Sequence, residues 1–332
     1  MAGSSTAMLK RYAHVDDYLG PGNRRFFGEG YKRADHRLRG IRTETDGSGA
    51  RLVAATATVS YPLDWSRKGD TDQRPHLSTI DVLLLGVQLA EVQLAGQLGL
   101  DPEQRAGMWV RRARIKAGSS PVEEDLAGFP VTAGFAGSVA SPGFPERQIS
   151  TVHCTVGSLK VTLDLDHARP SGGAVADPLD LGDSRSRPFG EGYKDRGQRV
   201  TDVTVDPEGL RSTAVVRLTA ADGASGPGVG VEGRYQPSVG LIDTFVVALQ
   251  LGQVLLYELD QLSRADSDTL WMRSTLFEAD SPHRPAEGDL TASAALENSM
   301  LLHKGDETWR RAEIVAALEG VRMTCSVVHR LP

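Results

Sequence analysis

The hexapeptide Phe27-Gly28-Glu29-Gly30-Tyr31-Lys32 decides how this chain is built, because it returns letter for letter as Phe189-Gly190-Glu191-Gly192-Tyr193-Lys194. The offset between the two is 162 residues (189 − 27). The same offset carries further residues onto identical ones: Ile80-Asp81 onto Ile242-Asp243, Gln88 onto Gln250, Trp109 onto Trp271 and Arg111 onto Arg273. This period is far longer than the ~20–50 residues of solenoid repeats. The sequence therefore predicts two copies of one fold, each large enough to be a domain.

Length, charge and cysteine content limit the class of protein. The 332 residues suffice for about two domains, in agreement with the repeat. A net charge of −6 argues against nucleic acid as a partner. Cys154 and Cys325 do not occupy equivalent positions, so we expect buried thiols in a reducing compartment rather than a disulfide. No metal-ligand spacing occurs, and neither a metal nor a cofactor is predicted.

The apolar pattern predicts a cytoplasmic protein with no membrane partner. Residues 1–14 lack the apolar core of a signal peptide. No stretch approaches the ~18 consecutive apolar residues that span a membrane. Turn-forming residues divide the chain into a leader (1–22), a first copy (23–167), a Pro- and Gly-rich linker (168–186) and a second copy (187–332).

Both copies are predicted to contain the same elements in the same order. Two strands with a turn between them come first, at residues 38–43 and 52–61 and again at 200–205 and 212–220. A long apolar helix without proline follows, at residues 78–98 and 241–262. Three strand-like runs close each copy, at residues 108–117, 131–140 and 151–165 and at 270–277, 290–302 and 311–328. In the second copy, Ala-, Glu- and Arg-rich pieces of the last two runs also favour helix.

This order predicts an α+β tandem double hotdog, in which two curved antiparallel sheets each wrap a long central helix. The helix is apolar on nearly all sides because the sheet encloses it. Hotdogs join edge to edge in pairs, and a tandem copy supplies the partner through a pseudo-two-fold relation. A pair of unrelated α+β sandwiches is the competing interpretation.

Asp81 and Asp243 are the leading catalytic candidates, because each begins an apolar helix where an unpaired acid is costly. Backbone N–H groups at a helix start can polarise a thioester carbonyl, and a carboxylate beside it can act as general base. The alternative is a helix cap, since Ser78-Thr79-Ile80-Asp81 has the form of a capping box. His76 precedes the first helix and has no counterpart, so it is an acid/base candidate or an ordinary loop histidine.

Several polar residues are substrate-binding candidates. Gln88 and Gln250 lie two turns into the helices, where they line a substrate tunnel or satisfy buried backbone groups. In the repeated hexapeptide, Glu29, Tyr31 and Lys32, with Glu191, Tyr193 and Lys194, form either a tight loop that meets an anionic group or a structural turn with a Glu–Lys pair. Arg111 and Arg273 each share a strand face with a tryptophan, which suits a phosphate or carboxylate clamp or a solvated surface.

Asp16-Asp17-Tyr18-Leu19-Gly20-Pro21, followed by Arg25-Phe26-Phe27-Gly28-Glu29-Gly30-Tyr31-Lys32-Arg33, resembles the opening of the AvrD family. The resemblance implies transfer of a β-ketoacyl group from a carrier-protein or CoA thioester to a keto-sugar, triose or pentulose or its phosphate. Condensation would then give a butenolide- or syringolide-like product. The A-factor synthase family does comparable chemistry and is likewise built as tandem hotdogs.

The resemblance assigns no catalytic residues by position, and it leaves a homodimer open. Two other functions stay open as well. One is a hotdog dehydratase or thioesterase, and a dehydratase would require a histidine opposite the aspartate. The other is a non-catalytic module that binds butenolides, although the aspartate is present in both copies.

Overall fold

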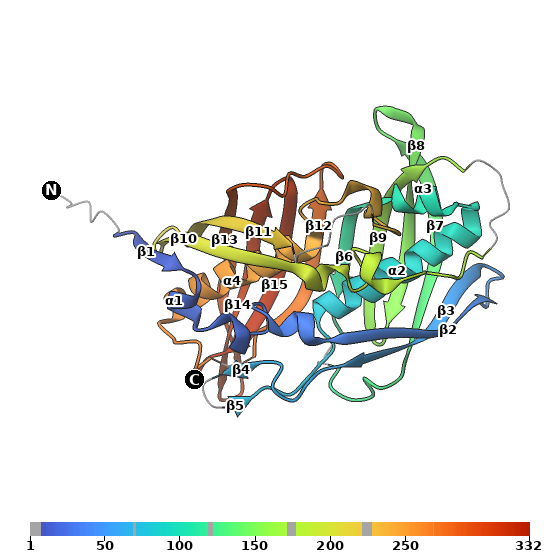
Figure 1. Ribbon diagram of the computed structural model, residues 1–332. Helices are drawn as coiled ribbons and strands as arrows, with labels where there is room; N and C mark the ends of the chain where they lie inside the picture. Colours follow the sequence, from blue (N-terminus) through green and yellow to red (C-terminus); the bar gives the residue numbers. More distant parts are fainter. Residues whose placement is uncertain (1–7, 69–70, 119–121, 171–176, 221–227, 268) are drawn as a thin grey trace.

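The computed structural model describes residues 8–68, 71–118, 122–170, 177–220, 228–267 and 269–332. The parts of the predicted leader at 1–7 and of the predicted linker at 171–176 lie outside these residues. The fold is α+β, as predicted, with one large antiparallel sheet and two long helices (Figure 1).

The elements of the first half begin with a short strand and a short helix, β1 (Lys10–His14) and α1 (Asp16–Leu19). Next come the hairpin β2 (Asp35–Thr45) and β3 (Arg51–Ser60), the small pair β4 (Arg67–Lys68) and β5 (Thr71–Asp72), the long helix α2 (Thr79–Leu98) and the short helix α3 (Pro102–Ala106). Four strands complete this half: β6 (Trp109–Lys116), β7 (Phe129–Ser141), β8 (Phe144–Val156) and β9 (Leu159–Ala168).

The second half repeats the hairpin, the long helix and the four final strands. Its elements are β10 (Arg196–Asp206), β11 (Arg211–Ala220), the helix α4 (Leu241–Asp260), β12 (Trp271–Ala279), β13 (Leu290–Lys304), β14 (Glu307–Leu318) and β15 (Val321–Arg330). The bounds of α4 equal those of α2 shifted by the repeat offset (79 + 162 = 241 and 98 + 162 = 260). The duplication seen in the sequence is therefore a duplication of structure.

A 13-stranded sheet joins the two halves in the order β1-β10-β11-β13-β14-β15-β12-β6-β9-β8-β7-β3-β2. Strands β12 and β6 pair at the junction, with Thr275 opposite Ile115 and Phe277 opposite Ala113. In Figure 1, α4 packs on the strands of the second half and α2 on those of the first. Each helix is thus enclosed by its own half of a continuous sheet.

The structure corrects three expectations about the elements. Each predicted last run, 151–165 and 311–328, contains a turn at Gly157 or Gly320, where φ is positive, so four strands and not three follow each long helix. The runs that also favoured helix form β13, β14 and β15. The predicted leader contributes β1, which pairs with β10 of the second half.

Helices α2 and α4 satisfy the length and apolarity of a membrane span, but they are core helices. The most apolar 18-residue window of α2 is 83% buried within the protein, and that of α4 is 94% buried. Ser78 caps the start of α2 and Gly99, in the left-handed region, ends it. The apolar length of each helix is therefore accounted for by the sheet that surrounds it.

At the interface, each half contributes a segment that packs on the long helix of the other half. The buried Arg25 donates through Nη1 to Gln250 Oε1 on α4 at 2.8 Å, and Phe27 packs edge-on against Phe245 at 5.7 Å. At the equivalent place Arg187 forms a buried ion pair with Glu91 on α2. The segment that carries each hexapeptide thus packs on the helix of the other half.

Candidate functional site

Asp81 lies at the centre of a buried polar cluster in the first turn of α2. Its carboxylate accepts from the Ser78 backbone N–H at 2.6 Å and from the Tyr61 hydroxyl, and Ser78 Oγ accepts in return from the Asp81 N–H at 3.2 Å. His36 Nε2 on β2 lies 2.6 Å from Asp81 Oδ1. The capping-box interpretation of Asp81 is therefore confirmed, and the cap also holds a histidine.

The protonation of this cluster follows from its contacts. A carboxylate only accepts, so His36 Nε2 carries the hydrogen that bonds Asp81, and His36 Nδ1 keeps a lone pair when the ring is neutral. This nitrogen is buried without a hydrogen-bond partner among the described residues. Burial and, secondly, the charge of Asp81 raise the pKa of Tyr61 well above its usual range, so Tyr61 stays a donor. The arrangement can accept a proton at His36.

The second half carries a different cluster at the equivalent place. Gln198 replaces the histidine (36 + 162) and donates through Nε2 to Asp243 Oδ1 at 2.8 Å. Arg196 Nη2 lies 3.1 Å from Asp243 Oδ2, and the Gly240 N–H donates to the same oxygen at 2.8 Å. Asp243 is thus fully engaged by an amide, a guanidinium and a backbone donor, and its cluster holds no imidazole.

Two tyrosines of the repeated hexapeptides connect the clusters. The rings of Tyr31 and Tyr193 stack at 5.9 Å with an interplanar angle of 22°. Tyr31 donates to Gln198 Oε1 at 2.8 Å, whereas the Tyr193 ring stands edge-on to the ring of His36 at 6.5 Å. Burial and then the charge of Asp243 raise the pKa of Tyr31. Each acidic cluster is therefore built from both halves of the chain.

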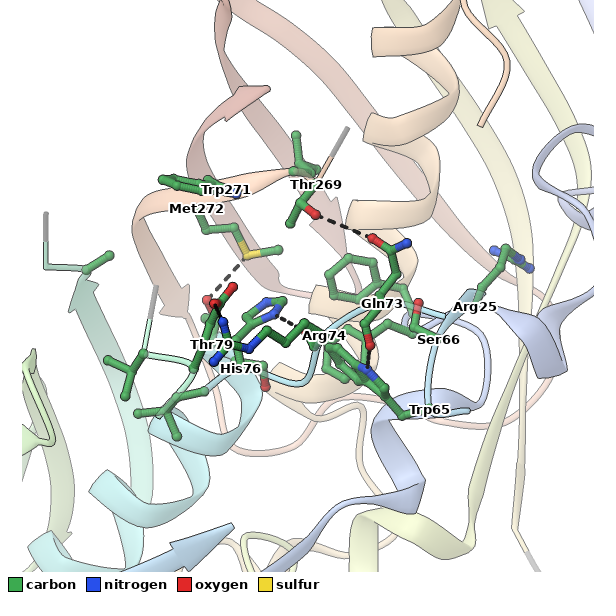
Figure 2. A pocket seen from close by; sticks show the side chains of 18 of the residues that line it. Arg25, Trp65, Ser66, Gln73, Arg74, His76, Thr79, Thr269, Trp271 and Met272 are labelled. Carbon is green, nitrogen blue, oxygen red and sulfur yellow. Dashed lines mark hydrogen bonds and ion pairs between the residues drawn. The ribbon is translucent and has the colours of Figure 1, made fainter. Parts of the chain in front are cut away.

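A cavity of about 250 Å³ lies at the amino-terminal end of α2, between the two halves (Figure 2). Its floor is held by contacts across the interface: Thr79 Oγ1 lies 3.3 Å from Met272 Sδ, and Thr269 Oγ1 lies 3.5 Å from Gln73 Oε1. One part of the lining is apolar and aromatic, with Phe26, Phe27, Trp65, Leu77, Phe245, Leu270, Trp271 and Met272, and the rest is polar or charged. An apolar wall combined with polar groups suits a small organic ligand.

The Asp81 cluster reaches this cavity at Ser78, which lines it, whereas aromatic rings lie between the cavity and the Asp81 carboxylate. Trp65 lines the cavity and donates through Nε1 to the Gln73 carbonyl at 2.6 Å. The Tyr61 ring packs against Trp65 at 4.7 Å while its hydroxyl bonds Asp81. Asp81 itself is 1% exposed and does not line the cavity.

A second hollow, of about 940 Å³, lies at the amino-terminal end of α4. It includes Asp243, Arg196 and Tyr193 in its wall. Seven positions that line it are equivalent by the repeat offset to positions that line the first cavity, beginning with Arg187 for Arg25 and ending with Leu241 for Thr79. The duplication thus provides two related openings with different chemistry.

The remaining predicted residues divide between the cavities and other places. His76 lines the first cavity and stands edge-on to Trp65 at 5.4 Å, and Arg273 lines the same cavity. Neither Gln88 nor Gln250 lines an opening. Gln88 donates a hydrogen bond to the Leu84 carbonyl of its own helix at 3.2 Å, and Gln250 accepts one from Arg25.

The charged residues of the hexapeptides pair within their own loops. Lys32 Nζ lies 2.8 Å from Glu29, and Lys194 Nζ lies 3.0 Å from Glu191 and 3.1 Å from Asp35. The glycines are required by close approach. A Cβ on Gly28 would lie 2.1 Å from the Gly22 oxygen, and one on Gly30 would lie 2.2 Å from the Trp65 oxygen.

Arg111 and Arg273 have different surroundings although they are equivalent. Arg111 lies over the Trp109 ring at 5.2 Å and pairs with the buried Asp166 at 3.2 Å. Val328 replaces Asp166 in the second half (166 + 162), and the exposed Arg273 forms no ion pair within the part of the chain that the structure describes. In the first half an acid of the protein itself therefore pairs with the arginine that was expected to bind an anion.

Sequence reasoning missed the residues that contact the aspartates. His36, Tyr61, Arg196 and Gln198 were not selected, although the repeat offset pairs His36 with Gln198. A comparison of the two copies for polar positions that differ could have found that pair. Nothing in the local pattern distinguishes Tyr61.

Solved structures that are similar to this chain include the following three. A provisionally assigned oleoyl thioesterase from Lactobacillus plantarum is similar with a TM-score of 0.44 and 13% identity, over 86% of this chain and 99% of the other. A provisionally assigned thioesterase from Novosphingobium aromaticivorans is similar with a TM-score of 0.40 and 11% identity, over 89% of this chain and 100% of the other. A hot dog fold protein of unknown function from Alicyclobacillus acidocaldarius is similar with a TM-score of 0.37 and 8% identity, over 88% of this chain and 96% of the other.

No match is found among curated proteins. A family model does match: that of the Pseudomonas avirulence D protein (AvrD), over residues 10–332. The match extends the resemblance noted at the start of the sequence to nearly the whole chain.

Proposed function

The chain belongs to the AvrD family over residues 10–332, and from this membership we propose that it transfers a β-ketoacyl group from a carrier-protein or CoA thioester to a keto-sugar, triose or pentulose or its phosphate. Condensation of the ester then gives a butenolide- or syringolide-like product. The buried, unpaired Cys154 and Cys325 fit the cytoplasmic location that such thioesters imply.

We interpret the two halves as a double hotdog related by a pseudo-two-fold axis. The equal bounds of α2 and α4 and the repeated strand order support this interpretation. In such an assembly the first opening, at the start of α2, is lined by residues of both halves, whereas the second, at the start of α4, is lined by residues of the linker and the second half.

The cavity at the start of α2 is the observation that carries the proposal. It combines an apolar aromatic wall, which suits an acyl group, with the amino-terminal end of a 20-residue helix at Ser78 and Thr79. The positive end of the helix dipole stabilises charge that develops on a thioester carbonyl oxygen.

The transfer step requires a group that takes one proton. The hydroxyl oxygen of the sugar attacks the thioester carbonyl carbon, the C–S bond breaks, and the proton passes through the base to the leaving thiolate. We assign this role to His36 backed by Asp81, because His36 Nδ1 has no partner among the described residues, whereas Asp243 is engaged by Arg196 and Gln198. The assignment requires the hydroxyl to reach the pair past Tyr61 and Trp65.

Ring closure follows from the chemistry of the ester. The methylene between its two carbonyls loses a proton, its carbon attacks the ketone carbonyl of the sugar, and loss of water gives the unsaturated ring. The same base can accept the methylene proton, since that proton is acidic. No residue beyond those already named is needed.

Incubation of the purified protein with a β-ketoacyl thioester and a panel of keto-sugars tests the proposal. Mass spectrometry is expected to find the acyl-sugar ester or its dehydrated ring, together with free thiol. His36→Gln is expected to abolish the product. Free thiol and β-keto acid without any sugar adduct would instead identify a thioesterase and overturn the proposal.

A second candidate is a dehydratase, which requires a histidine opposite an aspartate, and the pairing of His36 with Asp81 brings these two side-chain types together in the first half. A β-hydroxyacyl thioester distinguishes the two. A dehydratase converts it to the enoyl thioester with loss of water, whereas the proposed transferase leaves it unchanged when no sugar is present.

A further inference from the structure

The cavity at the start of α2 has a strongly basic wall. Its charged lining residues are Arg25, Lys68, Arg74, Arg264 and Arg273, against the single acid Glu123. His76 adds a further potential cation. An excess of guanidinium groups around a small, partly apolar cavity points to an anionic ligand.

The arginines differ in how far the protein itself neutralises them. Arg25 pairs with Asp16 and bonds Gln250, and Arg74 lies 2.8 Å from Glu123. Arg264 and Arg273 form no hydrogen bond or ion pair through their guanidinium groups within the described ranges of the chain. Two cations of this wall are therefore available to a ligand.

The half-buried guanidinium of Arg264 has no counter-charge in the part of the chain that the structure describes, and its burial is therefore energetically unfavourable. It lies half-buried on the segment after α4, and burial, together with the charge of Arg25, lowers its pKa, while Tyr257 acts in the opposite direction. A half-buried guanidinium without a counter-charge is unfavourable unless an anion supplies one. The position of Arg264 thus matches a binding role better than a structural one.

Arg273 can pair with a ligand because the second copy has no acid at the position of Asp166, which pairs with the equivalent Arg111 in the first copy. In the first half Asp166 pairs with Arg111 at 3.2 Å and with Arg147 at 2.5 Å. The offset places Val328 and Trp309 at the positions of Asp166 and Arg147 (166 + 162 and 147 + 162). Trp309 packs edge-on at 6.0 Å against Trp271, which lines the cavity, and neither Trp309 nor Val328 offers Arg273 a counter-charge.

We propose that Arg264 and Arg273 together bind a phosphate group of the substrate in this cavity. The inference rests on the proposed function and deepens it, because it makes one substrate a phosphorylated compound. A phosphate monoester carries up to two negative charges, and two guanidinium groups can bond its oxygens. The phosphate belongs either to the keto-sugar or to the phosphopantetheine arm that carries the acyl group, and one experiment separates these sources.

Isothermal titration calorimetry with two matched pairs of probes tests the proposal without any acyl transfer. The pairs are dihydroxyacetone phosphate with dihydroxyacetone, and phosphopantetheine with pantetheine. Wild-type protein is expected to bind the phosphorylated member of one pair at least about tenfold more tightly, the loss expected when a hydrogen bond to a charged group is removed. The pair that shows the difference identifies the source of the phosphate.

The variants Arg264→Gln and Arg273→Gln are each expected to weaken binding of that phosphorylated probe at least about tenfold, with binding of its unphosphorylated partner unchanged. Arg217→Gln is the matched control, since Arg217 lies on β11 and pairs with Asp289 at the surface. Melting temperatures confirm that each variant is folded. Equal binding of both members of each pair, or wild-type affinity in both variants, would overturn the proposal. Product formation from an unphosphorylated sugar would leave the proposed function standing in that case.

Discussion

His36 Nε2 lies 2.6 Å from Asp81 Oδ1, and this contact has no chemical equivalent in the other copy of the repeat. At the matching position Gln198 donates to Asp243 at 2.8 Å. A glutamine amide reproduces the hydrogen bond of an imidazole but cannot take up a proton near neutral pH. The two copies therefore share the architecture of the cluster. Of the residues that the structure describes, only the cluster around Asp81 contains a side chain that can transfer a proton near neutral pH.

Exchanging the two residues tests this division. His36→Gln is expected to lower kcat for acyl transfer about 100-fold or more, the usual contribution of general acid–base catalysis. Gln198→His is the matched control, and we expect kcat within about threefold of wild type. Steady-state rates with saturating thioester measure both. A His36→Gln enzyme with nearly wild-type kcat would show that the proton goes elsewhere.

Replacing Asp81 by Asn affects stability as well as turnover. The carboxylate accepts from the Ser78 N–H, Tyr61 and His36, so the variant loses acceptor capacity inside a buried cluster. We expect a loss of about 1–3 kcal/mol in unfolding free energy, measured in urea, and loss of product formation. Asp243→Asn is expected to lose comparable stability but to keep activity. Full activity in Asp81→Asn would remove the pair from the mechanism.

Glu91 is the strongest link between α2 and the second half. Its buried carboxylate lies 2.8 Å from Arg105 and also pairs with Arg187. Glu91→Gln leaves two buried guanidinium groups without their shared counter-charge, and we expect a loss of about 3–5 kcal/mol in unfolding free energy.

The exposed pair between Glu103 and Arg234, at 2.8 Å, provides the control for that measurement. Glu103→Gln is expected to leave the urea midpoint unchanged, because solvent screens a pair at the surface. Equal midpoints for Glu91→Gln and wild type would mean that the arginines find other partners.

The glycines of the hexapeptide are expected to be structural. A methyl group on Gly28 would lie 2.1 Å from the Gly22 oxygen, whereas one on Gly47 would meet nothing within 4 Å. Gly28→Ala is therefore expected to cost about 1–3 kcal/mol or more, and Gly47→Ala to stay within about 0.5 kcal/mol. Thermal unfolding monitored by circular dichroism compares them. Wild-type stability in Gly28→Ala would show that the loop relaxes freely.

His167 makes stability depend on pH on the acid side. The ring is buried, bonds Ser150 Oγ at 2.7 Å and the Ala168 carbonyl at 2.7 Å, and burial lowers its pKa. The unfolded chain therefore binds the proton more readily than the folded one, so the stabilising contribution is complete above the unfolded pKa of about 6.5 and is lost as pH falls from there through the folded pKa.

The expected slope is up to about 1.4 kcal/mol per pH unit within that window. Urea unfolding at a series of pH values, compared between wild type and His167→Gln, measures it. The exposed His303 supplies the control variant His303→Gln, for which the wild-type slope is expected. Identical slopes for wild type and His167→Gln would assign the dependence to other groups.

Local elements were predictable because local sequence controls them. The helices expected at 78–98 and 241–262 are observed at Thr79–Leu98 and Leu241–Asp260, since a long, mainly apolar stretch without proline exceeds the length of a strand and favours a buried helix. The final strands were merged in the prediction, because the turns at Gly157 and Gly320 interrupt apolar runs without any change in composition. Asp81 was found because its helix position is visible in the sequence.

By itself, the sequence determined that the chain is a duplicated fold with two buried helices that carry an aspartate in the first turn, because a repeat and a long apolar stretch can be read directly from the order of the residues. Only the tertiary structure decided that His36 meets Asp81, that the hexapeptide segments pack on the opposite helix, and that Arg264 and Arg273 share a cavity. The first two join residues far apart in the chain, the third depends on a cavity lined by both halves, and the packing of the sheet around the helices, rather than any local preference, brings these residues together.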